Sequence, residues 1–178
     1  MKKTFTILSL LLYSTLAVCQ PVTIDKSKSD LAIQGTSSLH DWESKVEDFQ
    51  ATADFSEDQV LNIAFEAIVK SIKSGKSGMD NNTYKALNEK EYPKITFKAN
   101  QLDIKGDQLV GNGQLTIAGK TNDIPINLTL SNASERSVKG SIKLKMTEYG
   151  VTPPTAVFGT IKTGDEVTIQ FNFTLKNT

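Results

Sequence analysis

The stretch from Glu91 to Thr121 constrains the fold most, because apolar and polar side chains alternate along it in two segments around a Gly-Asp turn. In the first segment, Lys94–Leu102, isoleucine, phenylalanine and alanine share one face, and lysine and threonine share the other. The second segment, Asp107–Ala118, repeats the pattern and carries Gly111 and Gly113 on its apolar face. A repeat of two residues with one apolar face is typical of an antiparallel sheet over a hydrophobic interior.

The same alternation recurs outside this stretch and predicts an all-β protein. Strands with polar outer faces and short turns favour a closed barrel or a sandwich. Eight strand-like segments can be counted, namely Asp30–Gly35, Glu47–Phe55, Val60–Ile72, Lys94–Leu102, Asp107–Ala118, Asp123–Leu130, Ser137–Thr147 and Glu166–Lys176.

One short helix is expected between the third and fourth of these strands, within Gly75–Lys90. Asp80 is a suitable N-cap, and Met79 and Leu87 belong to an approximate helical stripe. A helix at this place either covers one mouth of a barrel as a lid or plugs the barrel end for stability. The sequence leaves both roles open.

The first residues have the composition of an export signal. Two lysines precede an apolar run from Phe5 to Val18 that is too short to span a bilayer, and small residues follow. We therefore expect a signal peptide over residues 1–19, a single domain over residues 20–178, and a periplasmic location. The alternative is that Cys19 ends a lipobox and is acylated, although Val18 is bulkier than the residue usual before such a cysteine.

Charge and cysteine content exclude several classes of protein. Loss of the two leader lysines leaves 18 basic and 20 acidic residues, so no basic field exists to hold nucleic acid. No second apolar run is long enough for a transmembrane segment. A mature chain without Cys19 has no cysteine, which rules out disulfides and thiol chemistry. About 158 residues are enough for one full-sized core.

His40, the only histidine, is the one candidate for catalysis. A hydrolase would pair it with Ser37 or Ser38, but neighbours in an extended chain point to opposite faces and no nucleophile-elbow motif is present. The carboxylates near it show no metal-ligand spacing, and Gly75–Gly78 lacks the P-loop pattern. We expect no enzyme activity, no metal site and no cofactor.

A hydrophobic interior is the chemistry that remains. A barrel of about eight strands is just wide enough to be filled by side chains or to hold one apolar ligand. Gly111 and Gly113 on the inward face leave room where a larger side chain would close the interior. Glycine also lets a barrel wall coil sharply, and the pattern alone does not choose between the two.

The central stretch also resembles a known family. The sequence YPKITF, followed by a turn and then G-x-G-x-LTI-x-GKT, is similar to the signature of the YceI-like family, the polyisoprenoid-binding proteins of the bacterial periplasm. The likeness runs from Ile24 to Ile169 and implies a lipocalin-like antiparallel β-barrel that holds an isoprenoid chain. The family's R-D-x-H-L motif is replaced here by residues 79–87, of which Asp80 and Leu87 alone correspond, so ligand identity does not carry over.

These observations predict a periplasmic carrier for a long apolar ligand, an isoprenoid or another lipid. The alternative is a barrel filled by its own side chains, with a structural or stress-response role exerted through its surface. A homodimer is left open. The expected cavity wall consists of Ile63, Phe65, Ile95, Phe97, Leu115, Ile117, Ile126, Leu128, Ile142, Leu144, Ile169, Phe171 and Phe173. Met79, Leu87 and Phe158 are the expected mouth or lid residues.

Overall fold

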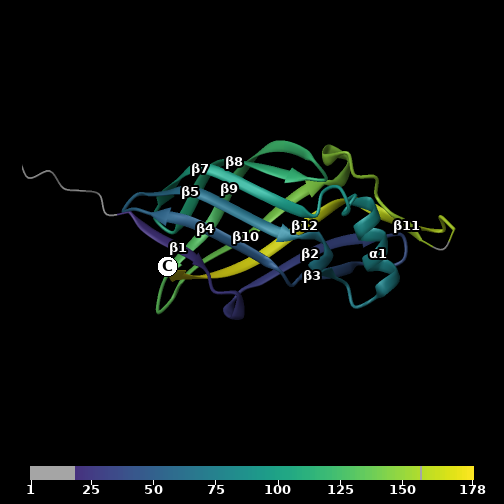
Figure 1. Cartoon of the computed structure of the whole chain (residues 1–178), viewed down its shortest axis with the longest axis horizontal. Coiled ribbons are helices and arrows are strands. Elements are labelled where there is room, and N and C mark those ends of the chain that lie inside the picture. Colours follow the sequence, from purple (N-terminus) through teal and green to yellow (C-terminus); the bar gives the residue numbers. More distant parts are fainter. Residues whose placement is uncertain (1–18, 157) are drawn as a thin grey trace, which may run out of the picture.

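The computed structural model describes residues 19–156 and 158–178, most of which lie in β-strands (Figure 1). The expected signal peptide therefore falls, except for Cys19, outside the described residues. The strands are β1 Gln20–Ile24, β2 Asp30–Ser37, β3 Trp42–Val46, β4 Phe49–Phe55, β5 Gln59–Ile68, β6 Ile72–Lys73, β7 Lys94–Lys105, β8 Gln108–Ile117, β9 Lys120–Asn132, β10 Arg136–Lys145, β11 Thr155–Ala156 and β12 Ile161–Asn177. The helices are α1 Ser77–Ala86 and the 3-10 turns η1 Lys26–Lys28, η2 Val69–Ser71 and η3 Met146–Tyr149.

Eight of these strands close into an antiparallel barrel, as the family resemblance implied. The ring runs β1, β4, β5, β7, β8, β9, β10 and β12. It closes at β1, where Val22 lies opposite both Ala53 of β4 and Asn177 of β12. The inward faces of these strands form the hydrophobic core, which fits the one-sided alternation of each strand.

Three further strands extend one end of the wall. β2 pairs with the first part of β12, β3 pairs with β2, and β6 pairs with β3. The wall bends where β1 passes into β2 through η1, whose first turn is capped by the Asp25 carboxylate accepting from the Ser27 amide at 3.1 Å. It bends again at η2, where the Val69 side chain is buried.

The predicted place of the helix in the strand order is wrong. α1 follows β6 and does not lie between the third and fourth strands of the fold. The error arises because β1, β3 and β6 are short strands that the alternation did not reveal. In β3, Ser44 and Val46 are buried between exposed charged residues, but only five residues carry the pattern.

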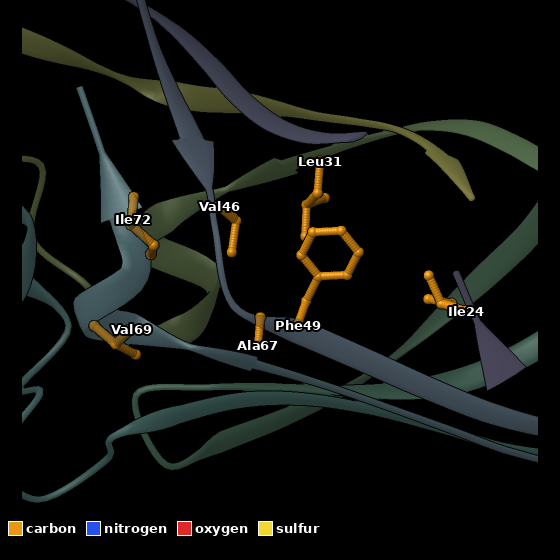
Figure 2. Packing of buried hydrophobic residues seen from close by; sticks show 7 residues of the cluster. All are labelled: Ile24, Leu31, Val46, Phe49, Ala67, Val69 and Ile72. Atoms are coloured by element: carbon orange, nitrogen blue, oxygen red, sulfur yellow. The ribbon is translucent and has the colours of Figure 1, made fainter. Parts of the chain in front are cut away.

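Side chains from distant parts of the chain meet inside the barrel near these bends. Figure 2 shows one such cluster, formed by Ile24, Leu31, Val46, Phe49, Ala67, Val69 and Ile72. Phe173 lies at its edge, with ring centroids 5.4 Å from Phe49, 5.9 Å from Phe65 and 4.7 Å from Phe171. Aromatic pairs at such separations add about 0.5–1.5 kcal/mol each beyond the area they bury.

Neighbouring side chains occupy the space beside the two glycines of β8. A Cβ atom at Gly113 would overlap the Phe97 ring, and one at Gly111 would lie 2.7 Å from a methyl carbon of Leu102. Both neighbours belong to β7, the adjacent strand. The glycines therefore make room for β7 side chains. This role differs from both that the sequence left open, which were space for a ligand and sharp coiling of the barrel wall.

Tyr92 and Gly119 hold the two ends of the Glu91–Thr121 stretch together. Gly119, in the β8–β9 turn, has a φ of 79°, a left-handed conformation that glycine adopts without strain. Its missing side chain leaves space that the Tyr92 ring occupies, just before β7. This contact fixes the turn beside the start of β7.

The seam between β9 and β10 is short. The two strands pair only where Thr129–Asn132 faces Arg136–Lys139. Within the described residues, the rest of β9 pairs with β8 and the rest of β10 pairs with β12. The end of the seam is covered by η3, where the Asn122 amide nitrogen donates to the Glu148 carbonyl oxygen at 3.0 Å.

Candidate ligand-binding cavity

An apolar chamber lies inside the barrel, between the eight strands of the ring. It has a volume of about 180 Å³, and the atoms exposed in it are apolar. Its wall includes the phenylalanines of β5, β7 and β12 and the aliphatic side chains that face them from β1, β8, β9 and β10. We call it the inner chamber. Such a surface binds by burial of area, because it offers a ligand no polar contact.

A second and larger chamber lies next to it, on the side of α1, with a volume of about 560 Å³. Irregular elements contribute much of its wall: α1, η3, the β2–β3 turn and the segment from Val151 to Ala156. We call it the mouth chamber. Four residues line both spaces, namely Ile33, Ile72, Ile95 and Ile169. This isoleucine collar forms a wall common to both chambers, which therefore adjoin each other.

Polar groups enter only at the mouth chamber. Ser44 on β3 lines it and is 3% exposed. Tyr149 on η3 also lines it, and its buried hydroxyl has no hydrogen-bond partner among the described residues. Burial raises the pKa of this phenol, and the nearby Asn122 side chain, which donates to Glu148, opposes the rise only in part. Buried polar atoms without partners are rare in folded proteins, which makes the Tyr149 hydroxyl the candidate for a polar contact at this wall.

Helix α1 lies over the mouth chamber and is tied to the chain before it. The Asp80 carboxylate accepts hydrogen bonds from the Ser74 amide at 2.8 Å and the Ser74 hydroxyl at 2.6 Å. Asp80 is therefore not the N-cap, which is Lys76. The Tyr84 hydroxyl donates to the Ile72 carbonyl oxygen, 3.1 Å away, and accepts from the Lys73 ammonium group at 2.8 Å.

None of the ten described residues of α1 is buried. Met79, Thr83 and Ala86 of this helix line the mouth chamber. A helix that plugged the barrel end would bury an apolar face, so this geometry favours the lid that the sequence left as one of two roles.

The structure places fifteen of the sixteen predicted site residues around these chambers. The thirteen predicted wall residues line one or both of them, and Met79 and Leu87 line the mouth chamber. Phe158 is different, because it is fully exposed and lines neither chamber. That the fifteen contact a ligand stays a prediction.

Several lining residues were not predicted. Val22 and Ile24 belong to β1, whose short alternation directly follows the expected leader. Tyr149 and Trp42 belong to irregular or short elements. The Trp42 ring lies over Gly35, and its indole nitrogen donates to the Thr36 carbonyl oxygen at 3.0 Å.

His40 is exposed on the β2–β3 turn, and its ring contacts the main chain. Its Nδ1 atom lies 2.8 Å from the Asp41 carbonyl oxygen. The Ser37 hydroxyl donates to the His40 carbonyl oxygen at 2.7 Å, so these serine and histidine side chains do not form a nucleophile–base pair. The described part of the chain holds no group of three side chains suited to a metal ion. Nor does any helix within it have the length and apolarity needed to cross a bilayer.

Comparison with known proteins gives one family and several similar folds. The sequence profile of the YceI-like domain matches residues 22–175. A search of curated proteins found no match.

Among solved structures, BcnA of Burkholderia cenocepacia shares 20% identity and a TM-score of 0.73, covering 86% of this chain and 99% of that one. A polyisoprenoid-binding domain from Saccharophagus degradans, implicated in plant cell wall breakdown, shares 11% identity and a TM-score of 0.64, covering 88% and 98%. The Campylobacter jejuni YceI protein shares 19% identity and a TM-score of 0.57, covering 76% and 84%. At these identities the likeness shows the fold alone.

Proposed function

The chain belongs to the YceI-like domain family, and from this premise we propose that it is a periplasmic carrier for a long apolar molecule, an isoprenoid or another lipid. The ligand lies along the barrel axis, with its chain in the inner chamber and one end in the mouth chamber. The similar fold of the polyisoprenoid-binding domain from Saccharophagus degradans supports this ligand class. The protein acts by binding and not as an enzyme.

The pair of adjoining chambers is the observation that carries the proposal. Its inner part exposes apolar atoms, and the isoleucine collar joins it to a mouth chamber of about 560 Å³. A volume of this size falls within the range of about 300–1,000 Å³ that is usual for small-molecule sites. Each methylene group that a ligand buries in such a surface contributes about 0.8 kcal/mol, so a chain of several isoprene units binds without directional contacts.

A substitution that fills the inner chamber tests the proposal. Ala53 on β4 lines the chamber, whereas Ala64 on the neighbouring β5 is exposed on the outer wall. We expect Ala53→Phe to weaken binding of an apolar fluorophore at least tenfold, because the added ring occupies the ligand's space. Ala64→Phe adds the same ring outside and leaves binding unchanged.

Circular dichroism checks that both variants are folded, since overpacking costs about 1–3 kcal/mol. Equal binding by the two variants contradicts a ligand in the inner chamber. It would favour the alternative, a filled barrel that acts through its surface.

The periplasmic location rests on the leader pattern of residues 1–19. Gln20 lies opposite Phe55 next to the β4–β5 turn, at the end of the barrel away from α1 (Figure 1). Processing at Cys19 therefore leaves the mouth unobstructed. Cell fractionation and the intact mass of the mature protein test the location, and a mass increase from acyl chains on Cys19 would show an anchored form instead.

A further inference from the structure

Two large apolar side chains are exposed among residues 19–156 and 158–178, and both lie at the mouth end of the barrel. Leu39, in the β2–β3 turn, is 66% exposed, and Phe158, in the β11–β12 turn, is fully exposed. Figure 1 shows the β11–β12 turn projecting beyond α1 at this end. We call Leu39 and Phe158 the apolar tip.

The turns that carry the apolar tip are joined by two hydrogen bonds. The Ser38 amide donates to the Lys162 carbonyl oxygen at 2.9 Å, and the Ser38 hydroxyl accepts from the Lys162 amide at 3.1 Å. Leu39, Ala156 and Ile161 also line the mouth chamber. The tip is therefore one structural unit at the rim of the cavity.

Packing within the chain explains neither the exposure nor the conformation of Phe158. Its φ of 53° is left-handed, which glycine and asparagine adopt readily and a bulky aromatic residue rarely does. The ring gains no burial in return, because it is fully exposed. Strained residues persist where another requirement maintains them, and contact with a partner outside the chain is such a requirement.

We propose that the apolar tip inserts into the surface of a lipid bilayer, so that the mouth chamber faces the membrane when ligand enters or leaves. The inference rests on the proposed function, because the ligand class resides in bilayers. Two side chains on convex turns suit a fluid surface, which closes around them. A protein partner would need a complementary face of roughly 800 Å².

The charges around the tip indicate a neutral lipid surface. Two cations, Lys76 and Lys162, and two anions, Asp41 and Glu43, lie in or next to the elements around the tip. Among the described residues the charges near the tip therefore balance and form no basic patch for anionic lipid. Two side chains bury less area than one acyl chain, which by itself anchors a protein only reversibly. Membrane contact is therefore brief, as a carrier requires.

Flotation with vesicles of pure phosphatidylcholine at millimolar lipid tests the proposal. We expect the wild type to float with the vesicles and Phe158→Asp to lose at least fivefold in apparent lipid affinity. Ala133→Asp is the matched control, because this exposed residue lies in the β9–β10 turn at the opposite end of the barrel, and it floats like the wild type. Phe158→Trp keeps an aromatic ring at the tip and retains binding.

Phe158→Gly separates membrane contact from stability. Glycine suits the left-handed backbone, so we expect this variant to unfold at the same or a higher temperature and still lose flotation. Failure of the wild type to float, or equal flotation by the aspartate, glycine and wild-type proteins, overturns the proposal. Self-association without vesicles that Phe158→Asp abolishes would assign the tip to a second copy, which also overturns it. We expect fluorophore binding without vesicles to be independent of Phe158. Failure of the membrane proposal is therefore distinguishable from failure of the proposed carrier function.

Discussion

The inner chamber and the mouth chamber adjoin each other but are built from different structural elements. The inner chamber is enclosed by barrel strands, and the atoms exposed in it are apolar. The mouth chamber is about three times larger, with walls that include a helix, a 3-10 turn and loops, and its lining includes Ser44 and Tyr149. The inner chamber thus exposes apolar atoms, whereas polar residues contribute to the wall of the mouth chamber.

A carboxylate placed in each chamber is expected to destabilise the protein by very different amounts. Ile126 on β9 is buried and lines the inner chamber, so Ile126→Asp leaves an unpaired charge without water. We expect a loss of ~3–5 kcal/mol in the free energy of unfolding, measured by urea denaturation.

Thr83→Asp puts the same group on α1 at the mouth chamber. We expect it to cost less than about 1 kcal/mol, because water reaches this wall. Similar losses for the two variants would show that the chambers do not differ in polarity.

The attachment of α1 gives a smaller effect that is confined to the mouth. Asp80→Ala removes the acceptor of both Ser74 hydrogen bonds and is expected to loosen the helix by about 1 kcal/mol. Hydrogen exchange should quicken in α1 and stay unchanged in β7 and β8. Asp58→Ala, in the exposed β4–β5 turn, is the control and should leave α1 unaffected. Faster exchange throughout the barrel would mean that α1 is a plug on which the core depends.

The same attachment has a defined pH dependence. Burial raises the pKa of the Asp80 carboxyl, but the hydrogen bonds from Ser74 and the charge of Lys73 outweigh it, so the pKa lies below its ordinary value of 3.8. A carboxyl with a lowered folded-state pKa stabilises the fold above its unfolded value, and this contribution is lost as the pH falls through the folded value. Protection of α1 should therefore hold at neutral pH and decline below about pH 4.

The smallest effect is expected at Tyr149. Tyr149→Phe removes a buried hydroxyl without a partner among the described residues, so stability should stay the same or rise by up to ~1 kcal/mol. Binding of an isoprenoid alcohol should weaken several-fold, whereas binding of the matching hydrocarbon should not change. A loss of stability in the unliganded protein would show that the hydroxyl has a structural partner.

The barrel wall could be predicted because each long strand shows its inward face directly in the sequence. In β12, for example, Ile169, Phe171 and Phe173 alternate with polar residues, and all three line a chamber. The seam also left a signal, since Pro125 on β9 has no amide to donate and lies where β9 has no pairing with β10 among the described residues.

The mouth could not be predicted in the same way, because periodicity carries no information about irregular elements. The short strands β3 and β6 escaped notice, and the position of α1 in the strand order was wrong as a result. Tyr149 joins the site through a 3-10 turn that follows β10. Phe158 was predicted as a mouth or lid residue; it lies at the mouth end in a left-handed conformation and is fully exposed.

The most direct test of the carrier function is native mass spectrometry of the protein purified from the envelope of its own host. We expect an added mass that solvent extraction removes, with a matching long apolar molecule in the extract. A protein that carries no added mass, yields no lipid and shows no competition for an apolar fluorophore would contradict it.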